Sequence, residues 1–197
     1  IFKMIRVVET NKAIQILKKG FPLGFPTDTL PAIGCLPEFT KVIYEFKKRD
    51  KNKALILMGS DISQVISYVH QSAIKDFLNL TEKFWPGPLT LVVPLAQGKN
   101  SLSISKINTI GLRIPGSSAA KSLISQTGPL ATSSANISGL ETSLTAHEVS
   151  KDLPNLTLLG PIPWEKCSGK GSTVISWVKK GEWKLLRQGQ INVLNNF

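Results

Sequence analysis

The sequence predicts an α/β fold. Short apolar runs that are typical of buried strands alternate with segments whose apolar residues recur at helical spacing. Residues 1–197 contain no internal repeat, no low-complexity tract and no linker long enough to divide the chain. A chain of 197 residues fits one domain that buries roughly 70% of its unfolded surface, so we expect a single domain.

The N-terminal elements are predicted from capping residues, glycine and proline. Thr10 can cap a helix with apolar residues on one face, and Gly20 ends it. Residues 20–35 are expected to be extended, because prolines interrupt them. Thr40 can cap a second helix that carries the basic residues 47–53 at its C-terminal end, where exposed carbonyl groups favour cations.

The middle of the chain alternates between strand and helix. Residues 54–58 are a short apolar run, typical of a buried strand. Residues 61–68 and 72–84 have helical spacing, and the second segment must end before Pro86. Two further apolar runs and a helix ended by a glycine follow, at 89–95, 110–114 and 117–125 with Gly128.

The C-terminal third predicts one more strand, a helix and a hairpin. Residues 130–134 read as a strand that runs into a loop. Thr145 and Glu148 have the spacing of a capping box, which marks the start of a helix. Residues 172–177 and 183–187 are expected to pair as a hairpin around a Lys-Lys-Gly turn.

The charge balance indicates an anionic ligand. Hydrophobic residues make up 42% of the chain and charged residues 19%, as in ordinary globular proteins, but 24 Lys+Arg against 13 Asp+Glu give a net charge of +11. This excess concentrates anions such as nucleotides, RNA or anionic lipid, although a merely soluble basic surface has the same composition. No run approaches the roughly 18 apolar residues of a membrane span, and no signal-peptide segment follows residues 1–4. We therefore expect a cytoplasmic protein with no membrane partner.

Several kinds of chemistry find no support in the residues. Cys35 and Cys167 lie outside any metal-ligand spacing, and we expect both to be reduced and buried. His70 and His147 lie far apart in polar helical segments, so we interpret both as surface residues. No GxxxxGK[ST] loop occurs and no GxGxxG follows a strand. An enzyme of this sequence should act by positioning and electrostatics, as in phosphoryl and nucleotidyl transfer.

Basic residues close to buried strands fit that kind of chemistry. Five cationic side chains lie within residues 47–53, directly before an apolar run. Most basic runs are solvated helix ends, but lysine and the planar fork of arginine are also the usual ligands of phosphate. Arg113 lies inside an apolar strand, where an unpaired charge costs several kcal/mol, so its expected partner is a bound anion or a carboxylate such as Asp28. The same reasoning applies to Arg187, which also lies next to apolar residues.

Two segments rich in small hydroxyl residues add donors for phosphate or ribose. Residues 132–139 place hydroxyl groups and one amide after a strand, and residues 171–173 are Gly-Ser-Thr. Alone, each would be an ordinary turn. Residues 85–88, Trp-Pro-Gly-Pro, predict a helix stop with a core tryptophan and no chemistry.

Together these segments match, in order, the motifs of one known family. The chain resembles the YrdC/Sua5 family of threonylcarbamoyl-AMP synthases from about Gly20 to Gly189, and we expect the short, single-domain type because the chain ends soon after Arg187. The matching segments are 25–29, 47–49 with Lys53, 84–90, 111–115, 134–139, 172–174 and 186–189.

The resemblance implies both a fold and a reaction. The YrdC-like fold is a twisted, mostly mixed sheet with flanking helices and a large basic cavity. The implied reaction joins L-threonine, bicarbonate and ATP into threonylcarbamoyl-AMP and pyrophosphate, toward the t6A modification of tRNA. Mg²⁺ would be bound through the phosphates of ATP. Downstream t6A transferase proteins are implied partners, and tRNA or double-stranded RNA is a further possible one.

The resemblance also implies roles for nine residues. The nucleotide would be held by Lys47, Arg49, Arg187, Ser134 and Asn136, with Lys47 and Arg49 as the catalytic residues. Threonine would be held by Thr27, Thr29, Arg113 and Ser172, with Arg113 as the partner of its carboxylate.

The chain departs from the family at residues 30–32, and alternatives to the leading reading stay open. Leu30-Pro31-Ala32 stands where the family has Val-Tyr-Gly, so the aromatic side chain that helps to enclose the amino acid is missing. This difference bears on the selectivity for threonine. One alternative function is a non-catalytic protein of the same fold that binds double-stranded RNA or tRNA. Another is a related carbamoyl-adenylate step on a different acceptor.

Overall fold

The computed structural model describes residues 5–99 and 108–193. Within these ranges the strands are β1 Val7–Val8, β2 Leu23–Phe25, β3 Ala32–Cys35, β4 Ile56–Met58, β5 Leu89–Pro94, β6 Thr109–Arg113, β7 Leu130–Ser134, β8 Thr157–Leu159, β9 Thr173–Lys179 and β10 Glu182–Arg187. The α-helices are α1 Thr10–Lys18, α2 Lys41–Lys47, α3 Ile62–Val65, α4 Ile74–Phe84, α5 Ser118–Thr127 and α6 Ala146–Asp152. Two short 3₁₀ helices are η1 Pro37–Phe39 and η2 Ile66–Tyr68.

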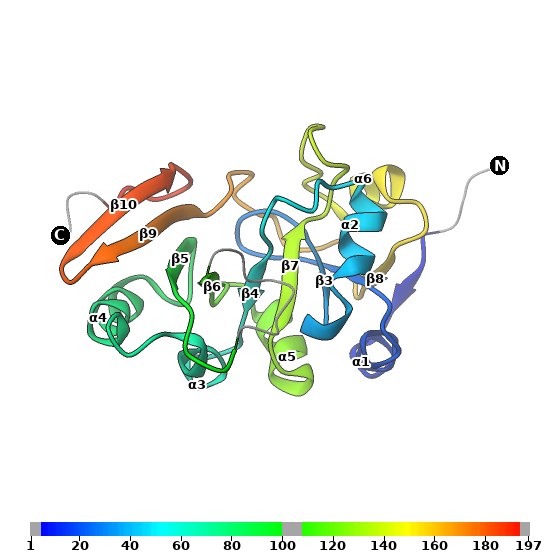
Figure 1. Ribbon diagram of the computed structural model, residues 1–197. Helices are drawn as coiled ribbons and strands as arrows, with labels where there is room; N and C mark the ends of the chain where they lie inside the picture. The colour runs from blue at the N-terminus through cyan, green and yellow to red at the C-terminus, as the bar shows by residue number, and fades with distance from the viewer. Residues whose placement is uncertain (1–4, 100–107, 194–197) are drawn as a thin grey trace.

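All these strands belong to one mixed sheet that runs along the molecule (Figure 1). Their order is β1-β8-β2-β3-β7-β4-β6-β5-β9-β10. Neighbours pair in parallel at β4 and β6 and at β5 and β9, and antiparallel at β3 and β7 and at β9 and β10. The predicted α/β fold with a mixed sheet is confirmed.

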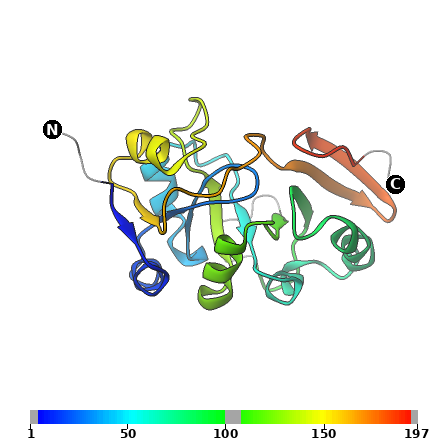
Figure 2. The ribbon, with the colours of Figure 1, turned by 180° about the vertical axis from the view of Figure 1, so that it is seen from behind.

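The helices divide unequally between the two faces of the sheet. Helices α1, α3, α4 and α5 lie along one face, and α2 and α6 lie on the other near β3 and β8 (Figures 1 and 2). Among the described residues, no helix lies on that second face over β4, β6 and β5. The sheet is therefore covered on one face and left concave and open on part of the other.

Alternation along the strands produces this arrangement. In β5, Leu91 and Val93 are fully buried on the helix-covered face, whereas Val92 and Pro94 are half-buried on the other face. On the covered face, Phe77 of α4 packs edge-on against Trp85, with their ring centroids 5.4 Å apart. The apolar residues of the central strands thus fix which face receives helices.

Several sequence predictions are confirmed at the level of single residues. The capping box of Thr145 and Glu148 opens α6, and Ser117 caps α5, which ends at Gly128. The terminal hairpin forms from β9 and β10. His147 is exposed, and the half-buried His70 bonds through its ring to the exposed hydroxyl of Ser72.

Other predictions are wrong in detail. The N-cap of α1 is Glu9 rather than Thr10, and Thr40 precedes α2 with helical backbone angles and no capping hydrogen bond, because η1 leads directly into α2. Residues 20–35 are extended as predicted over β2 and β3, but the turn between these strands and their antiparallel pairing were not predicted. Cys35 is buried as expected, whereas Cys167 is half-exposed, and both are free. Strands β1 and β8 were not predicted, and residues 1–4 lie outside the described ranges.

Candidate active site

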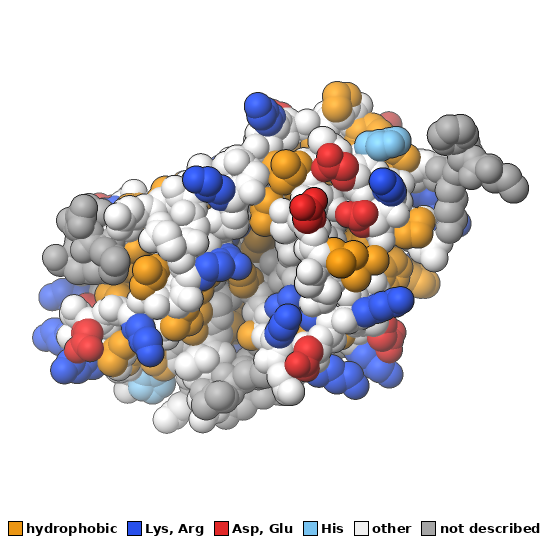
Figure 3. All heavy atoms as spheres, turned by 90° about the horizontal axis from the view of Figure 1, so that it is seen from above, with side chains coloured by type: hydrophobic (Ala, Val, Ile, Leu, Met, Phe, Trp, Pro, Cys, Tyr) orange, Lys and Arg blue, Asp and Glu red, His pale blue; other side chains and the backbone are white. Residues whose placement is uncertain are grey.

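Six of the nine predicted site residues line one cavity on the open face of the sheet. The cavity has a volume of about 600 Å³, counting space open to solvent. These six residues are Thr29, Arg49, Arg113, Ser134, Ser172 and Arg187. Seen from this side, the surface is hollowed, and Lys and Arg side chains lie on both sides of the hollow (Figure 3). The three remaining residues, Thr27, Lys47 and Asn136, lie behind the lining and bond to it.

A helix-ending turn separates Lys47 from Arg49. Lys48 adopts the left-handed conformation, with a φ of 49°. Its N–H donates to the Glu45 carbonyl at 3.3 Å, and the Arg49 N–H donates to the Tyr44 carbonyl at 2.9 Å. This pair of bonds is a Schellman motif, which turns the chain sharply after the helix. The Arg49 guanidinium then donates to the Ala54 carbonyl at 2.9 Å, beside β4.

Lys47 is a buried cation next to the cavity. Its side chain is 1% exposed, and its Nζ donates to the Ser134 carbonyl. The Ser134 and Asn136 side-chain oxygens lie 3.4 and 3.5 Å from Nζ. Burial, followed by repulsion from Arg49 and Lys53, lowers the pKa of Lys47 from 10.5 to about 7. The oxygens described around Nζ are all uncharged, so an arriving anion would be the first negative charge to stabilise its protonated form.

The loop after β7 is fixed by its own hydrogen bonds. Ser134 Oγ donates to Asn136 Oδ1 at 2.6 Å, and Asn136 Nδ2 donates to the carbonyls of Ile137 and Leu140 at 2.9 and 3.0 Å. The Ser138 N–H donates to the Lys47 carbonyl at 3.0 Å, which ties this loop to the end of α2. These hydrogen bonds connect the lysine to the Ser/Asn turn.

The turn between β2 and β3 is tied to Arg113. Thr27 Oγ1 donates to the Leu30 carbonyl at 2.6 Å and lies 3.1 Å from Thr29 Oγ1. Arg113 Nη1 donates to Thr29 Oγ1 at 2.8 Å, and Nη2 donates to Asp28 Oδ1 at 2.7 Å. The sequence prediction of Asp28 as the partner of Arg113 is confirmed. Burial lowers the pKa of Arg113 while Asp28 raises it, and the guanidinium keeps its charge.

Arg187 and Ser172 form the opposite wall. Arg187 donates to the Ser172 carbonyl through Nε at 3.1 Å and through Nη2 at 2.9 Å, and Nη2 also lies 3.2 Å from Ser172 Oγ. Burial lowers the pKa of Arg187. The Ser172 hydroxyl lies 2.8 Å from Thr90 Oγ1, and Thr90 is fully buried. No role was predicted for Thr90 from the sequence. The available signal was its position between Leu89 and Leu91, where a buried hydroxyl group needs a hydrogen-bond partner.

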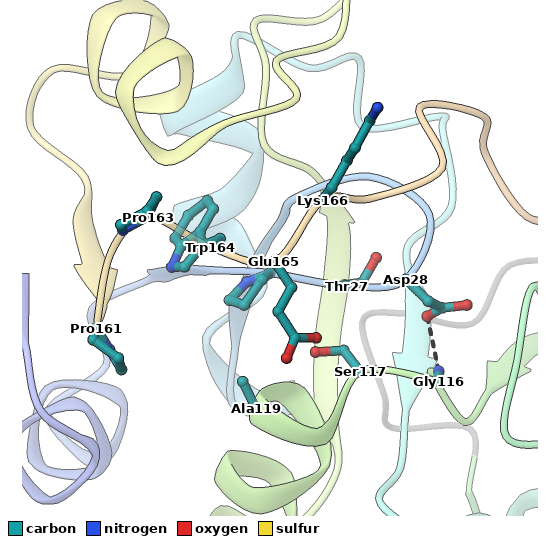
Figure 4. Close-up of a pocket in the computed structure, with 12 residues that line it drawn as sticks. Thr27, Asp28, Gly116, Ser117, Ala119, Pro161, Pro163, Trp164, Glu165 and Lys166 are labelled. Atoms are coloured by element: carbon teal, nitrogen blue, oxygen red, sulfur yellow. Dashed lines mark hydrogen bonds between the residues drawn. The ribbon is translucent and has the colours of Figure 1, made fainter.

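A second hollow lies on the other side of the Thr27–Asp28 backbone, and it has different chemistry. Its walls include prolines and Trp164, and the Glu165 side chain points toward Ser117 at the start of α5 (Figure 4). Lys166 points away from Glu165, and Asp28 accepts a 2.8 Å hydrogen bond from the Gly116 N–H. Among the described residues that line this hollow, Lys166 is the one cation, so this part of the chain does not offer the several cations that a polyanion requires.

Neither a metal cage nor a membrane span is found in the described parts of the chain. Residues 5–99 and 108–193 contain no group of three or more His, Cys, Asp or Glu side chains placed to hold a metal ion. None of the helices in these ranges has the length and apolar character needed to cross a bilayer.

Comparison with known proteins identifies the family. Residues 15–189 match the Sua5/YciO/YrdC family model, which carries the description "Telomere recombination". The chain belongs to this family.

Individual relatives are similar over most of the chain. A protein of Idiomarina loihiensis named threonylcarbamoyl-AMP synthase is 35% identical over 70% of this chain and 76% of its own length. One of Aliivibrio fischeri with the same name is 30% identical over 73% of this chain and 80% of its own length. The structure of P. abyssi Sua5 complexed with L-threonine superposes with a TM-score of 0.83 at 28% identity, covering 94% of this chain. The match spans only 57% of that Sua5 chain.

Proposed function

We propose that this protein is a threonylcarbamoyl-AMP synthase, a nucleotidyltransferase that acts in the t6A modification of tRNA. L-threonine and bicarbonate would form the carbamate of the threonine amine with loss of water. The carbamate oxygen would then attack the α-phosphate of ATP, and pyrophosphate would leave. The names of the relatives and the threonine complex of P. abyssi Sua5 support this function. They do not favour the alternative of a non-catalytic RNA-binding protein.

One observation carries the proposal. Arg49 follows α2 and Arg187 ends β10, and they line a single cavity with the hydroxyl of Ser134, behind which Lys47 is buried. Cations brought together from distant segments suit a triphosphate, whose transfer needs positioning and charge stabilisation more than a nucleophilic side chain. Lys47 and Arg49 would stabilise the charge that develops on the α-phosphate, with Ser134 and Asn136 beside the nucleotide.

The threonine would bind at the wall formed by Thr27, Thr29, Arg113 and Ser172. The hydrogen bonds described for Arg113 use three of its five N–H donors, so a substrate carboxylate can take the others. Mg²⁺ would enter with ATP, bridged by its phosphates more than by protein ligands. We expect the protein to act in the cytoplasm and to pass its product to downstream t6A transferase proteins, with tRNA as a further possible partner.

The test is product formation by the purified protein. With Mg²⁺, ATP, L-threonine and bicarbonate, mass spectrometry should detect threonylcarbamoyl-AMP, and pyrophosphate release should stop when any one substrate is omitted. Arg49→Ala should lower the rate at least 100-fold. Lys12→Ala removes an exposed charge on α1 and should leave the rate unchanged. The same assay should be run with serine and other amines, because Leu30-Pro31 replaces the residues that enclose threonine in the family. Equal pyrophosphate release with one of these amines would mean that threonine is not the specific acceptor.

A further inference from the structure

Arg187 lies at the end of the sheet, where the strand ladder gives its backbone little support. Strand β10 ends the sheet and pairs with β9, and this pairing is irregular between Leu185 and Arg187 (Figure 1). The Arg187 guanidinium bonds to the Ser172 carbonyl, and an added Cβ at Gly171 would lie 3.4 Å from its Cζ and Nη2 atoms. These contacts locate the charged group, but the backbone that carries it must be held by the residues that follow.

The four residues after β10, 188–191, fold back onto the start of β9, and we call them the return segment. Within it, the Gln190 N–H donates to the Gly171 carbonyl at 3.0 Å. An added Cβ at Gly189 would come within 2.4 Å of backbone atoms of residues 171–173. Because these are backbone atoms, they cannot move aside as the end of a side chain can, so this close contact requires glycine.

One hydroxyl group holds the return segment in place. Thr173 is fully buried at the first position of β9, and its own N–H donates to the Pro88 carbonyl at 2.9 Å, so its backbone is fixed at the start of β5. Its Oγ1 donates to the Ile191 carbonyl at 2.5 Å and accepts from the N–H groups of Gly189 and Ile191 at 3.1 and 3.3 Å. A hydroxyl donates one hydrogen bond and accepts two, so Thr173 spends this whole capacity on the return segment.

We propose that Thr173 is a positioning residue for Arg187. This inference rests on the proposed function, in which Arg187 binds the phosphates of ATP. By holding the return segment against β9, the Thr173 hydroxyl fixes the backbone directly after Arg187 and directs the guanidinium into the cavity. Without the hydroxyl, Arg187 keeps its charge but loses its single position, and a cation that must be reordered at each turnover stabilises a transferring phosphate less.

Three substitutions test the role of the hydroxyl group. Thr173→Val keeps the shape of the side chain and removes the hydroxyl, whereas Thr173→Ser keeps the hydroxyl. Thr81→Val is the control, because Thr81 is 1% exposed and its hydroxyl bonds to the Leu78 carbonyl within α4. Calorimetric affinity for inorganic tripolyphosphate should fall about fivefold or more in Thr173→Val, and the KM for ATP should rise by a similar factor. Both quantities should stay within twofold of the wild type in Thr173→Ser and Thr81→Val.

A double-mutant cycle with Arg187→Ala separates positioning from a merely structural role. If Thr173 acts through Arg187, Thr173→Val should change tripolyphosphate affinity by less than twofold in the Arg187→Ala background. The melting temperature should still fall by the same amount in both backgrounds, because the hydrogen bonds of Thr173 to the return segment are lost in each. An equal fold-loss of tripolyphosphate affinity in both backgrounds would overturn the proposal, as would a loss of less than twofold in Thr173→Val alone.

Gly189→Ala displaces the return segment from its other side and decides the question if Thr173→Val does not fold. It should weaken tripolyphosphate binding about fivefold or more, and this loss should also disappear in the Arg187→Ala background. Persistence of the loss there would overturn the proposal. A wild type that binds tripolyphosphate but forms no threonylcarbamoyl-AMP would overturn the proposed function, while the binding cycle would still decide the role of Thr173. A wild type that binds neither ATP nor tripolyphosphate would overturn both.

Discussion

Arg113 Nη2 lies 2.7 Å from Asp28 Oδ1, and the same carboxylate oxygen accepts a 2.8 Å hydrogen bond from the Gly116 N–H. Arg113 is 3% exposed and Asp28 is 22% exposed. One carboxylate thus joins the β2–β3 turn to β6 and to the segment that leads into α5. The pair separates the cation-lined cavity from the second hollow, because Arg113 lines the first and Asp28 lines the second.

Asp28→Ala is expected to destabilise the fold by about 3 kcal/mol. The substitution leaves the guanidinium of Arg113 buried without its counter-charge, and removing one partner of such a pair is more costly than removing both. Asp28→Asn keeps an oxygen for the Gly116 N–H and should lose less, about 1–2 kcal/mol. Urea denaturation of the two variants measures the difference.

The double variant Asp28→Ala/Arg113→Met provides the control for that experiment. It removes the orphaned charge and should recover part of the stability that Asp28→Ala loses. Arg113→Met alone completes the cycle. If the double variant lost as much free energy of unfolding as the two single variants together, the pair would not act as a unit.

Stability should also depend on pH through Lys47. The pKa of this amine is about 7 in the folded protein, against 10.5 for an unperturbed lysine. Between these values the unfolded chain binds more protons than the folded one, so the free energy of unfolding should rise as the pH rises from 7 to 10. At 1.36 kcal/mol per pKa unit, the difference between 10.5 and about 7 limits the Lys47 contribution to at most about 5 kcal/mol.

Lys47→Met isolates that contribution. Its free energy of unfolding should lack the rise between pH 7 and pH 10 that the wild type shows, while Lys12→Met, on the surface of α1, should keep it. Equal pH profiles for wild type and Lys47→Met would mean that Lys47 titrates normally. Tripolyphosphate should reduce the wild-type slope, because an anion beside Lys47 raises its pKa again.

Most elements were predictable because they follow local rules. The helix of Thr145 and Glu148, the strand of residues 130–134 and the terminal hairpin are each encoded by residues close together in the chain. Strands β1 and β8 are three residues or fewer and pair with each other across the chain, so no local pattern identifies them. The turn between β2 and β3 is closed by the Thr27 side chain, which bonds to the carbonyl and the N–H of Leu30. The prolines in this segment indicated an extended chain and gave no sign of this turn.

The sequence predicted which residues form the site better than it predicted the contacts that these residues make. Motif residues from distant segments do line one cavity, and the Asp28 partner of Arg113 follows from the cost of an isolated buried charge. The sequence does not show that Lys47 is 1% exposed, because a run of basic residues normally indicates a solvated helix end. Its burial depends on the loop at Ser134–Asn136, almost 90 residues away in the chain.

Lys48→Gly is expected to stabilise the protein by about 0.5–1 kcal/mol. Lys48 has a φ of 49°, in the left-handed region that costs an L-residue roughly 1–2 kcal/mol, and glycine adopts it freely. The larger entropy of glycine in the unfolded chain removes part of this gain. Thermal and urea denaturation measure the change. Lys48→Ala keeps the Cβ and should not stabilise, so equal gains for alanine and glycine would locate the effect in the lost charge.

Thr90→Val tests a residue that lies in the matching segment 84–90 but was assigned no role from the sequence. The Thr90 hydroxyl lies 2.8 Å from Ser172 Oγ, which in turn lies 3.2 Å from Arg187 Nη2. Valine keeps the shape of the side chain and removes the hydroxyl, so Ser172 loses one of the two bonds that orient it. The KM for threonine should rise about threefold to tenfold, whereas the KM for ATP should stay within twofold. A stability loss of about 1–2 kcal/mol is also expected, because a buried hydrogen bond is broken.

Thr81→Val is the matched control for this prediction. Thr81 is as buried as Thr90, and its hydroxyl donates to the Leu78 carbonyl at 3.0 Å within α4, away from the cavity. Its variant should lose similar stability and leave both KM values unchanged. If Thr81→Val raised the KM for threonine as much as Thr90→Val does, general loosening of the fold would explain both. If Thr90→Val left that KM unchanged, the orientation of Ser172 would not depend on Thr90, and Arg187 alone would hold it.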